Sequence, residues 1–162
     1  MELWDLYDKN RVFVKSDHIR GEKIEKGLYH LCVHVWIKNS DGKFLISQRN
    51  SCRPTFPSMW ECVGGSAIKG EDSYKAAIRE TIEEVGLDLR NSKGVVINTV
   101  TREEFNDIMD VWLFTYDGEL TFDKRTTDET SQVKWMSVDE IKTLWKDKKF
   151  VPTLFYFFDI LI

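Results

Sequence analysis

The chain has 162 residues, of which 42% are hydrophobic and 31% carry a charge, and its formal net charge is −4. This length and composition predict a single globular domain, residues 1–162, with a core of ordinary size. The negative charge and the lack of a basic stripe argue against non-specific nucleic-acid binding, so we expect no nucleic acid as a partner.

The cysteines and the two ends of the chain indicate in which cellular compartment the protein resides. Cys32, Cys52 and Cys62 are odd in number and lack CxxC spacing, which is typical of a reducing environment. The acidic amino terminus has no apolar signal core, and the most apolar stretch, residues 151–162, is too short to span a bilayer. We therefore expect a cytoplasmic protein without a membrane partner.

The first fifty residues predict two hairpins. Residues 2–6 alternate between polar and apolar, and a turn separates them from a second short apolar run at 12–14. Residues 16–27 are polar, and we expect them to be irregular. Residues 30–38 predict a strong strand, which a polar turn connects to a returning strand over 43–49.

One face of the strand over residues 30–38 carries His30, Cys32, His34 and Trp36. Two histidines and a cysteine along one strand could bind a metal, although this set would need a further ligand. The alternative is a buried polar face or one that lines a cleft. We favour this alternative because the spacing matches no tight metal site.

The rest of the chain mixes strands and helices around a loop at residues 50–59. We expect strands over residues 60–67, 95–105, 108–116 and 129–136, and helices that begin after the N-cap Asp72, at the capping box Ser137–Glu140 and at Pro152. The face with Trp112, Phe114 and Tyr116 is either core or a base-stacking platform, and core is the commoner use. The last apolar helix should pack on the body or on a second subunit, so a homodimer is one possible assembly.

Residues 65–87, GSAIKGEDSYKAAIRETIEEVGL, combine glycine, charge and helical pattern more densely than any other stretch. The helix is predicted from Asp72 to Val85. Its periodicity places four apolar residues on a stripe that should face the core: Tyr74, Ile78, Ile82 and Val85. The glutamates lie on roughly the opposite side of the helix.

Three of these glutamates, Glu80, Glu83 and Glu84, form a group of like charges. Arg79 can reach Glu83, but no lysine follows at i+4 to relieve the repulsion. A solvated helix face is the alternative interpretation. Clustered carboxylates beside a glycine-rich approach are better explained by a hard divalent cation, which prefers oxygen ligands.

The spacing G-x5-E-x7-R-E-U-x-E-E-x-G-U, where U is aliphatic, resembles the Nudix box. All its fixed positions are occupied between Gly65 and Leu87, and only Thr81 departs from an aliphatic class. The resemblance implies an α+β fold, an α/β/α sandwich with a mixed sheet. It also implies Mg²⁺- or Mn²⁺-dependent hydrolysis of a diphosphate linkage in a nucleoside diphosphate derivative or a related small molecule.

The same resemblance implies roles for individual residues. The expected metal-binding set is Gly65, Glu71, Glu80, Glu83 and Glu84. Arg79 would orient the glutamates. The general base would be Glu84 or a downstream acid such as Glu129. Arg49, Arg53 and Trp60 are candidates for contacts with the substrate, and each could equally be structural.

Residues 29–31, 48–49 and 55–60 resemble the Nudix branch that includes isopentenyl-diphosphate isomerases. Those enzymes need a cysteine and a histidine where this chain has Gly65 and Ala67. We therefore expect hydrolysis in place of isomerisation. A non-catalytic nucleotide sensor is a further alternative, but loss of box glutamates would be its sign, and none is lost.

Overall fold

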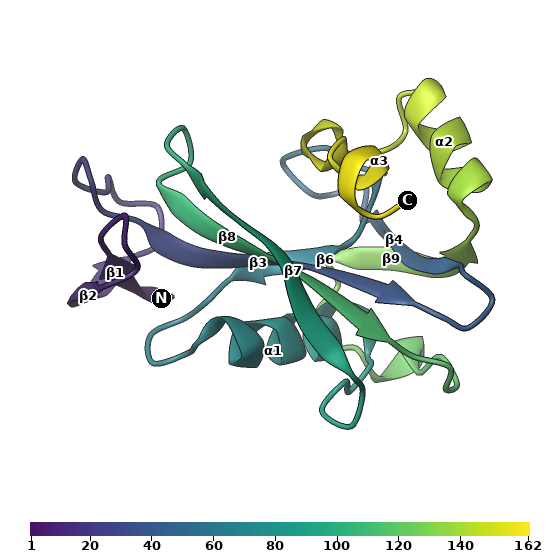
Figure 1. Ribbon diagram of the computed structural model, residues 1–162, viewed down its shortest axis with the longest axis horizontal. Coiled ribbons are helices and arrows are strands. Elements are labelled where there is room, and N and C mark those ends of the chain that lie inside the picture. The colour runs from purple at the N-terminus through teal and green to yellow at the C-terminus, as the bar shows by residue number, and fades with distance from the viewer.

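A seven-stranded mixed sheet forms the centre of the protein in a computed structural model that describes residues 1–162 (Figure 1). Its strands are β3 (His30–Lys38), β4 (Phe44–Arg49), β5 (Trp60–Glu61), β6 (Val63–Ser66), β7 (Gly94–Arg102), β8 (Asp107–Thr115) and β9 (Thr130–Met136). β3 and β8 pair in parallel along their whole length, and the other ladders of this sheet are antiparallel. All the predicted strands are present.

Helices cover both faces of this sheet. α1 (Ser73–Val85) lies on one face, while α2 (Val138–Lys146) and α3 (Phe157–Ile160) lie on the other (Figure 1). Two short 3₁₀ turns, Phe122–Lys124 and Pro152–Leu154, complete the helical content. The predicted α+β fold, an α/β/α sandwich, is confirmed.

Successive side chains of β3 point to opposite faces of the sheet, so this strand contributes to the hydrophobic core on both faces. Val33 and Val35 belong to the buried cluster under α1, whereas Trp36 belongs to the cluster on the opposite face. β4 touches β3 in register only at Lys38↔Phe44, after which β6 takes its place beside β3. This exchange brings the strand that leads into α1 to the middle of the sheet.

α1 begins and ends as predicted. The side chain of Asp72 caps its first turn by accepting a hydrogen bond from the backbone N–H of Lys75. Gly86 ends it with φ 74°, and a Cβ there would lie 2.2 Å from the carbonyl oxygen of Thr121, so only glycine fits.

The predicted apolar stripe of α1 is partly wrong. Tyr74 is 39% exposed and Ile82 is half-buried, whereas the small residues Ala76 and Ala77 are fully buried. Small side chains allow the helix axis to lie close to the sheet, which rotates the contact face towards them. Thr81 is fully buried on the same face and donates its hydroxyl to the carbonyl oxygen of Ala77, which explains why a polar residue is accepted there.

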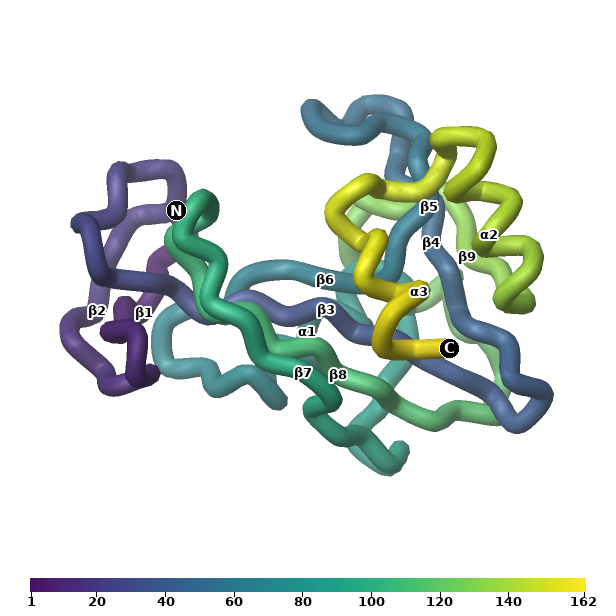
Figure 2. Tube along the Cα trace, turned by 45° about the horizontal axis from the view of Figure 1, so that its top comes forward, coloured from purple at the N-terminus to yellow at the C-terminus, as the bar shows by residue number.

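A separate two-stranded sheet lies at one end of the molecule (Figure 2). It consists of β1 (Leu3–Tyr7) and β2 (Phe13–Ile19), which confirms the predicted amino-terminal hairpin. The expectation that residues 16–27 are irregular is wrong for their first part. β2 continues to Ile19 because that residue pairs with Leu3.

The carboxyl-terminal segment packs on the body of the protein. In place of one helix from Pro152, it forms a 3₁₀ turn followed by the four-residue α3. Leu154 and Phe157 are buried in the cluster around Trp36, while Phe155 on the other side is 57% exposed. No helix in the protein combines the length and apolarity needed to cross a membrane.

Phe157→Ala should lower the free energy of unfolding by about 3 to 5 kcal/mol, because the fully buried ring contacts Trp36 and Phe44. Urea denaturation measures this change. Phe155→Ala, two residues away and exposed, is the matched control and should change stability by less than about 0.5 kcal/mol. Equal effects of the two substitutions would contradict the described packing.

Candidate active site

The site begins where β6 leads into α1. Gly64 and Gly65 pair with His34 and Val33 of β3. A Cβ on Gly65 would lie 2.2 Å from Oε1 of Glu80, and one on Gly64 would lie 2.8 Å from the carbonyl oxygen of Val33. The glycines therefore allow α1 to bring its glutamates against the strand.

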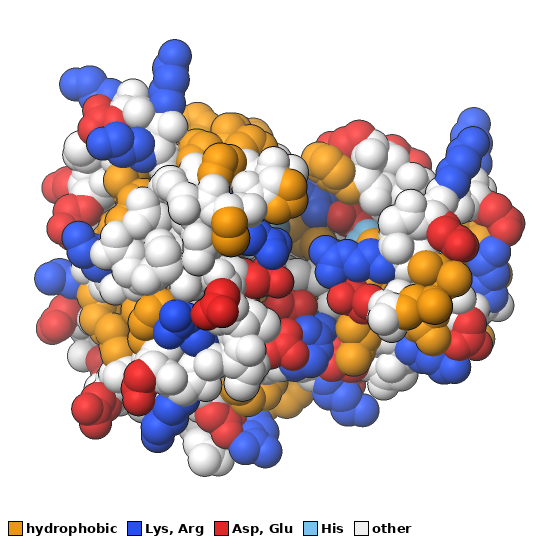
Figure 3. Space-filling model, turned by 180° about the vertical axis from the view of Figure 1, so that it is seen from behind, with side chains coloured by type: hydrophobic (Ala, Val, Ile, Leu, Met, Phe, Trp, Pro, Cys, Tyr) orange, Lys and Arg blue, Asp and Glu red, His pale blue; other side chains and the backbone are white.

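A cavity of about 140 Å³ opens beside this contact, and none of its twelve lining residues is hydrophobic. The lining is Glu2, Arg20, Arg49, Arg53, Gly64, Gly65, Ser66, Arg79, Glu80, Glu83, Glu84 and Glu129. Figure 3 shows the hollow face on which acidic and basic side chains gather between the two lobes of the molecule. Five parts of the chain thus meet at one polar cavity: the amino-terminal hairpin, β4 with the loop after it, β6, α1 and the segment before β9.

Arg79 is the centre of the hydrogen bonding in the site. Its Nε and Nη2 bind both oxygens of Glu71 at 2.9 and 3.0 Å, and Nη2 also donates to the carbonyl oxygen of Ser66 at 2.8 Å. Its Nη1 reaches Glu80 at 2.8 Å and Glu83 at 3.0 Å. The glutamates are therefore less isolated than the sequence pattern indicated, because one guanidinium pairs with three of them.

Glu84 is the exception among the box glutamates. It is 6% exposed, and its Oε2 is buried without a hydrogen-bond partner. Burial raises the pKa of Glu84 well above its ordinary range, and the nearby carboxylates of Glu61 and Glu80 raise it further. Burial also raises the pKa of Glu80 to about 7, although Arg79 opposes the shift.

A divalent cation fits this donor set. A buried carboxylate oxygen without a partner is costly unless a proton or a cation reaches it. Glu80, Glu83 and Glu84 could supply carboxylate oxygens to a hard cation, and the backbone at Gly65 faces the same cavity. The carboxylates do not form a preassembled metal cage, because Arg79 holds Glu80 and Glu83.

Glu71 is placed differently from the other expected metal ligands. Both of its oxygens bind Arg79, and Oε2 also accepts the backbone N–H of Ile68 at 3.1 Å. It does not line the cavity. In this arrangement Glu71 positions Arg79, and Arg79 lies between it and the other glutamates.

Two of the three expected substrate contacts line the cavity. Arg49 lies 2.8 Å from Glu61, and Arg53 lies 2.9 Å from Glu129. Trp60 does not line it: this residue is 7% exposed and belongs to the buried cluster on the α2 side of the sheet. The expectation for Trp60 is corrected, because strand alternation turns Trp60 into the core and its neighbour Glu61 towards Arg49.

Glu129, the downstream candidate for the general base, also lines the cavity. Backbone and side-chain donors of Thr126 and Thr127 bind the carbonyl oxygen of Glu83, at 3.1 Å in each case. The backbone N–H of Asn50 binds the carbonyl oxygen of Glu129 at 2.8 Å. The segment before β9 is thereby attached to both α1 and the loop after β4.

Three residues in or beside the cavity were not predicted from the sequence: Glu61, Glu2 and Arg20. Glu61 is half-buried against Arg49, and desolvation raises its pKa although Arg49 opposes the shift. Glu2 and Arg20 reach the cavity from the amino-terminal hairpin. An acidic residue beside the tryptophan was a usable signal for Glu61, but no local pattern marks the other two.

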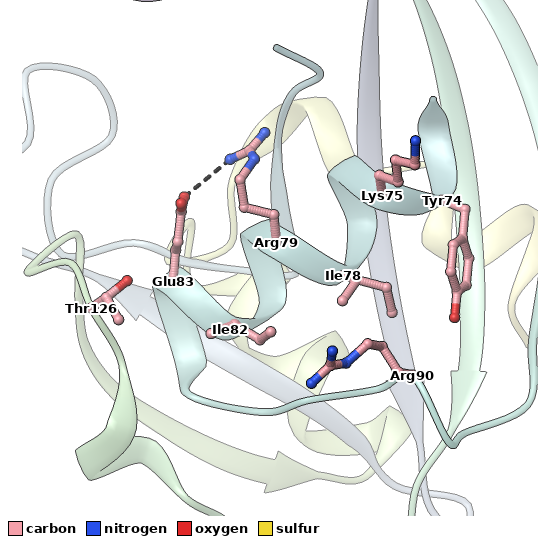
Figure 4. Close-up of a pocket in the computed structure, with 8 residues that line it drawn as sticks. All are labelled: Tyr74, Lys75, Ile78, Arg79, Ile82, Glu83, Arg90 and Thr126. Carbon is pink, nitrogen blue, oxygen red and sulfur yellow. Dashed lines mark hydrogen bonds and ion pairs between the residues drawn. The ribbon is translucent and has the colours of Figure 1, made fainter. Parts of the chain in front are cut away.

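The outer side of α1 borders a different hollow of about 440 Å³ (Figure 4). Tyr74, Ile78 and Ile82 line it, together with Arg90 from the segment after the helix. The predicted core stripe thus partly faces this hollow. Arg79 and Glu83, whose ion pair Figure 4 draws on the same helix, line both this hollow and the polar cavity.

The histidine face of β3 is enclosed by the carboxyl-terminal segment. Nδ1 of His34 lies 2.7 Å from the hydroxyl of Tyr156, to which Trp36 also donates its indole N–H at 3.0 Å. Burial lowers the pKa of His34 to about 3. His30 stacks on Trp4 with ring centroids 3.9 Å apart. These placements match the cleft-lining or buried polar face favoured from the sequence.

The low pKa of His34 predicts acid sensitivity. Below about pH 6.5 the unfolded histidine takes up a proton that the folded ring does not, so the free energy of unfolding falls as the pH falls towards 3. Because His34 keeps some accessible surface, we expect a loss of about 1 to 2 kcal/mol between pH 7.5 and about 5. Urea denaturation should show a smaller loss for His34→Gln. His18→Gln is the matched control and should lose as much stability as the wild type, and an equal loss in His34→Gln would contradict this assignment.

The chain matches the model of the NUDIX domain over residues 28–155. It is 37% identical over 164 residues to the Nudix hydrolase lin0387 of Listeria innocua, and the match covers 98% of this chain and 91% of that protein. The Nudix hydrolase lmo0368 of Listeria monocytogenes is 36% identical over 159 residues, with the same coverage.

Solved structures agree with this fold. DR0079 from Deinococcus radiodurans superimposes with a TM-score of 0.74 at 19% identity, covering 93% of this chain and 92% of that one. A bifunctional NMN adenylyltransferase/ADP ribose pyrophosphatase from Francisella tularensis, complexed with AMP and a Mn ion, gives a TM-score of 0.59 at 23% identity. That match covers 82% of this chain and 41% of the bifunctional protein. By its domain match over most of its length and by its relatives, the chain belongs to the Nudix hydrolase family.

Proposed function

We propose that this protein is a divalent-metal-dependent diphosphohydrolase acting on a nucleoside diphosphate derivative or a related small-molecule diphosphate. The observation that carries the proposal is the wholly polar cavity in which Glu84 is buried with an unpartnered oxygen. Residues 1–162 would form one catalytic domain with a small-molecule substrate and with no nucleic acid or membrane as a partner.

Metal binding would involve Glu80, Glu83 and Glu84, with the backbone at Gly65. Nudix proteins generally use a divalent metal, and the related structure from Francisella tularensis contains a Mn ion. A bound Mg²⁺ or Mn²⁺ would neutralise the diphosphate and activate water. Some of the hydrogen bonds from Arg79 to Glu80 and Glu83 would break when the metal binds, while those to Glu71 would keep Arg79 in place.

The remaining residues of the cavity would handle the substrate and the proton. Arg49 and Arg53 present planar guanidinium groups suited to phosphate oxygens. Glu84 or Glu129 would accept the proton of the attacking water, since both line the cavity. Charge neutralisation and positioning would provide most of the rate acceleration, as is general for phosphoryl transfer.

Isomerisation finds no support at the corresponding positions. Gly65 and Ala67 stand where a catalytic cysteine and a metal-binding histidine would be needed. Cys62, the nearest thiol, is 2% exposed, and burial raises its pKa well above the ordinary value. A buried, protonated thiol outside the cavity lining cannot contact a substrate held there.

Glu84→Gln should lower kcat by roughly 100-fold or more, because it removes either a metal ligand or the base. Hydrolysis of a panel of nucleoside diphosphate derivatives in the presence of Mg²⁺, with ADP-ribose first, measures the effect. Cleavage of the diphosphate gives two phosphomonoesters, from which added alkaline phosphatase releases inorganic phosphate for detection. Glu22→Gln, on the exposed segment after β2, is the control and should retain activity. If the wild-type protein and Glu84→Gln are equally inert on every substrate, the enzymatic assignment fails and a ligand sensor becomes the better explanation.

Saturating Mg²⁺ should stabilise the folded protein. At a concentration of one hundred times Kd, binding to the native state alone adds about 2.7 kcal/mol to the free energy of unfolding. Thermal denaturation with Mg²⁺ and with EDTA measures this difference, and Glu84→Gln should lose most of it while Glu22→Gln keeps it. A wild-type melting temperature that Mg²⁺ leaves unchanged would contradict the proposed metal site.

A further inference from the structure

The amino-terminal hairpin reaches the cavity although it lies outside the NUDIX domain match, which begins at residue 28. Glu2 precedes β1 and Arg20 follows β2, so both belong to the open end of the hairpin. The only parts of the first 27 residues that line the cavity are these two charged side chains.

The hairpin is attached to the body at several points. Near its turn, Arg11 forms a two-pronged ion pair with Asp110 of β8 at 2.9 and 2.7 Å, and Asp110 is buried. The loop before α1 binds the hairpin along its length, because the N–H of Lys69 donates to Leu3 at 2.8 Å and the N–H of Gly70 donates to Asp5 at 2.8 Å. These contacts hold the open end over the cavity.

The two partners of the Glu2–Arg20 ion pair differ in how many other contacts fix them. Nη1 of Arg20 lies 3.0 Å from Oε2 of Glu2, and Oε1 of Glu2 accepts the indole N–H of Trp4 at 2.8 Å. Trp4 is itself held by stacking on His30. Glu2 is therefore fixed by two contacts, whereas Nη1 is the only guanidinium nitrogen of Arg20 that is bonded within the protein.

Arg20 consequently keeps donors that Arg79 and Arg49 do not. Arg53, the remaining arginine of the cavity, pairs with Glu129 and leaves its buried Nε without a partner. Arg79 uses all three of its guanidinium nitrogens on Glu71, Glu80, Glu83 and Ser66. Arg49 uses all three on Glu61 and Thr55. Arg20 is 57% exposed, with Nε and Nη2 available to a ligand.

The space around this pair suits a diphosphate with a larger group attached. The polar cavity of about 140 Å³ has room for phosphoryl groups but not for a nucleoside. A second hollow of about 490 Å³ adjoins it and shares Glu2, Arg79 and Glu83 with it. Leu3 and Lys69 also line this hollow, so the hairpin and the loop before α1 form its walls.

We infer that the amino-terminal hairpin forms one wall of the substrate site, with Arg20 binding the phosphoryl group farther from the box glutamates. This inference rests on the proposed diphosphate substrate. Glu2 competes for the guanidinium in the free protein, and a phosphoryl oxygen replaces it when the substrate binds. Arg20 is thus a binding residue, and Glu2 lowers the affinity of the site while it holds Arg20 in position.

Competition between Glu2 and a phosphoryl group for Arg20 can be distinguished by mutagenesis from a purely structural ion pair. If the pair only holds the ends of the hairpin together, removal of either partner has the same effect. If Arg20 binds phosphate against competition from Glu2, removal of Arg20 weakens binding and removal of the Glu2 charge strengthens it. The two substitutions therefore act in opposite directions.

The test is isothermal titration calorimetry of the full chain with methylenediphosphonate, a diphosphate analogue that cannot be hydrolysed, in the presence of Mg²⁺. Arg20→Ala should weaken binding roughly tenfold, as expected for one charge-assisted contact. Arg20→Lys should restore part of the affinity, because it keeps the charge without the planar fork. Glu2→Gln should bind the analogue more tightly than the wild type.

Lys15→Ala is the matched control, since Lys15 lies on the same hairpin in an exposed ion pair with Glu25 and lines neither hollow. It should bind the analogue like the wild type. Unchanged affinity in Arg20→Ala, or equal losses in Arg20→Ala and Glu2→Gln, would overturn the inference. If Arg20→Ala fails to fold by circular dichroism, Arg20→Lys and Glu2→Gln still decide the sign.

The same titration separates this inference from the proposed function. If the wild-type protein binds the analogue through Arg20 but hydrolyses no diphosphate, the inference stands and the hydrolase assignment fails. If the protein hydrolyses a diphosphate and Arg20→Ala leaves kcat and KM unchanged, the proposed function stands and the inference fails. For a supporting result, the change should appear in KM and leave kcat nearly unaffected.

Discussion

The five hydrogen bonds of Arg79 are the interaction on which the rest of the site depends. They join the turn that carries Glu71, the end of β6 at Ser66 and two glutamates of α1 into one unit. A guanidinium can do this because its five donors lie in a plane and point in fixed directions. A lysine would offer charge without that geometry, so the loop and the helix would no longer share one anchor.

The second constraint is the close approach of α1 to β6. Gly65 has no side chain, and Ala76 and Ala77 present only methyl groups, so the helix can lie near the strand. That proximity buries Glu84 beside Gly64 and leaves its Oε2 without a hydrogen-bond partner inside the protein. The close packing of helix and strand thus causes the free-energy cost of burying the Glu84 carboxylate. A cation that approaches Glu84 would lower this cost.

How much could be predicted from the sequence depended on how local the determining interactions were. The box, its N-cap Asp72 and its terminating Gly86 lie within a few turns of one another, so their spacing alone specified the helix. Trp60 was misjudged because strand alternation has two phases, and only packing decides which residue turns inward. Glu2 and Arg20 could not be found, because about eighty and about sixty residues of chain, respectively, separate them from the box glutamates that line the same cavity.

The attachment of the amino-terminal hairpin has a consequence for how such a protein can change. The hairpin shares no ladder with the central sheet apart from a single bridge between Tyr7 and Tyr29, and otherwise reaches the body mainly through side chains and loop backbone. Its exposed positions can therefore change without altering the register of the strands that hold the box, whereas the buried Trp4 and Leu6 and the Arg11–Asp110 ion pair keep it attached. The exposed part of the hairpin and the strands that hold the box can therefore change independently of each other. If the open end of the hairpin lines the substrate site as proposed, substitutions there would alter which molecule is bound while the glutamates of α1 stay in place.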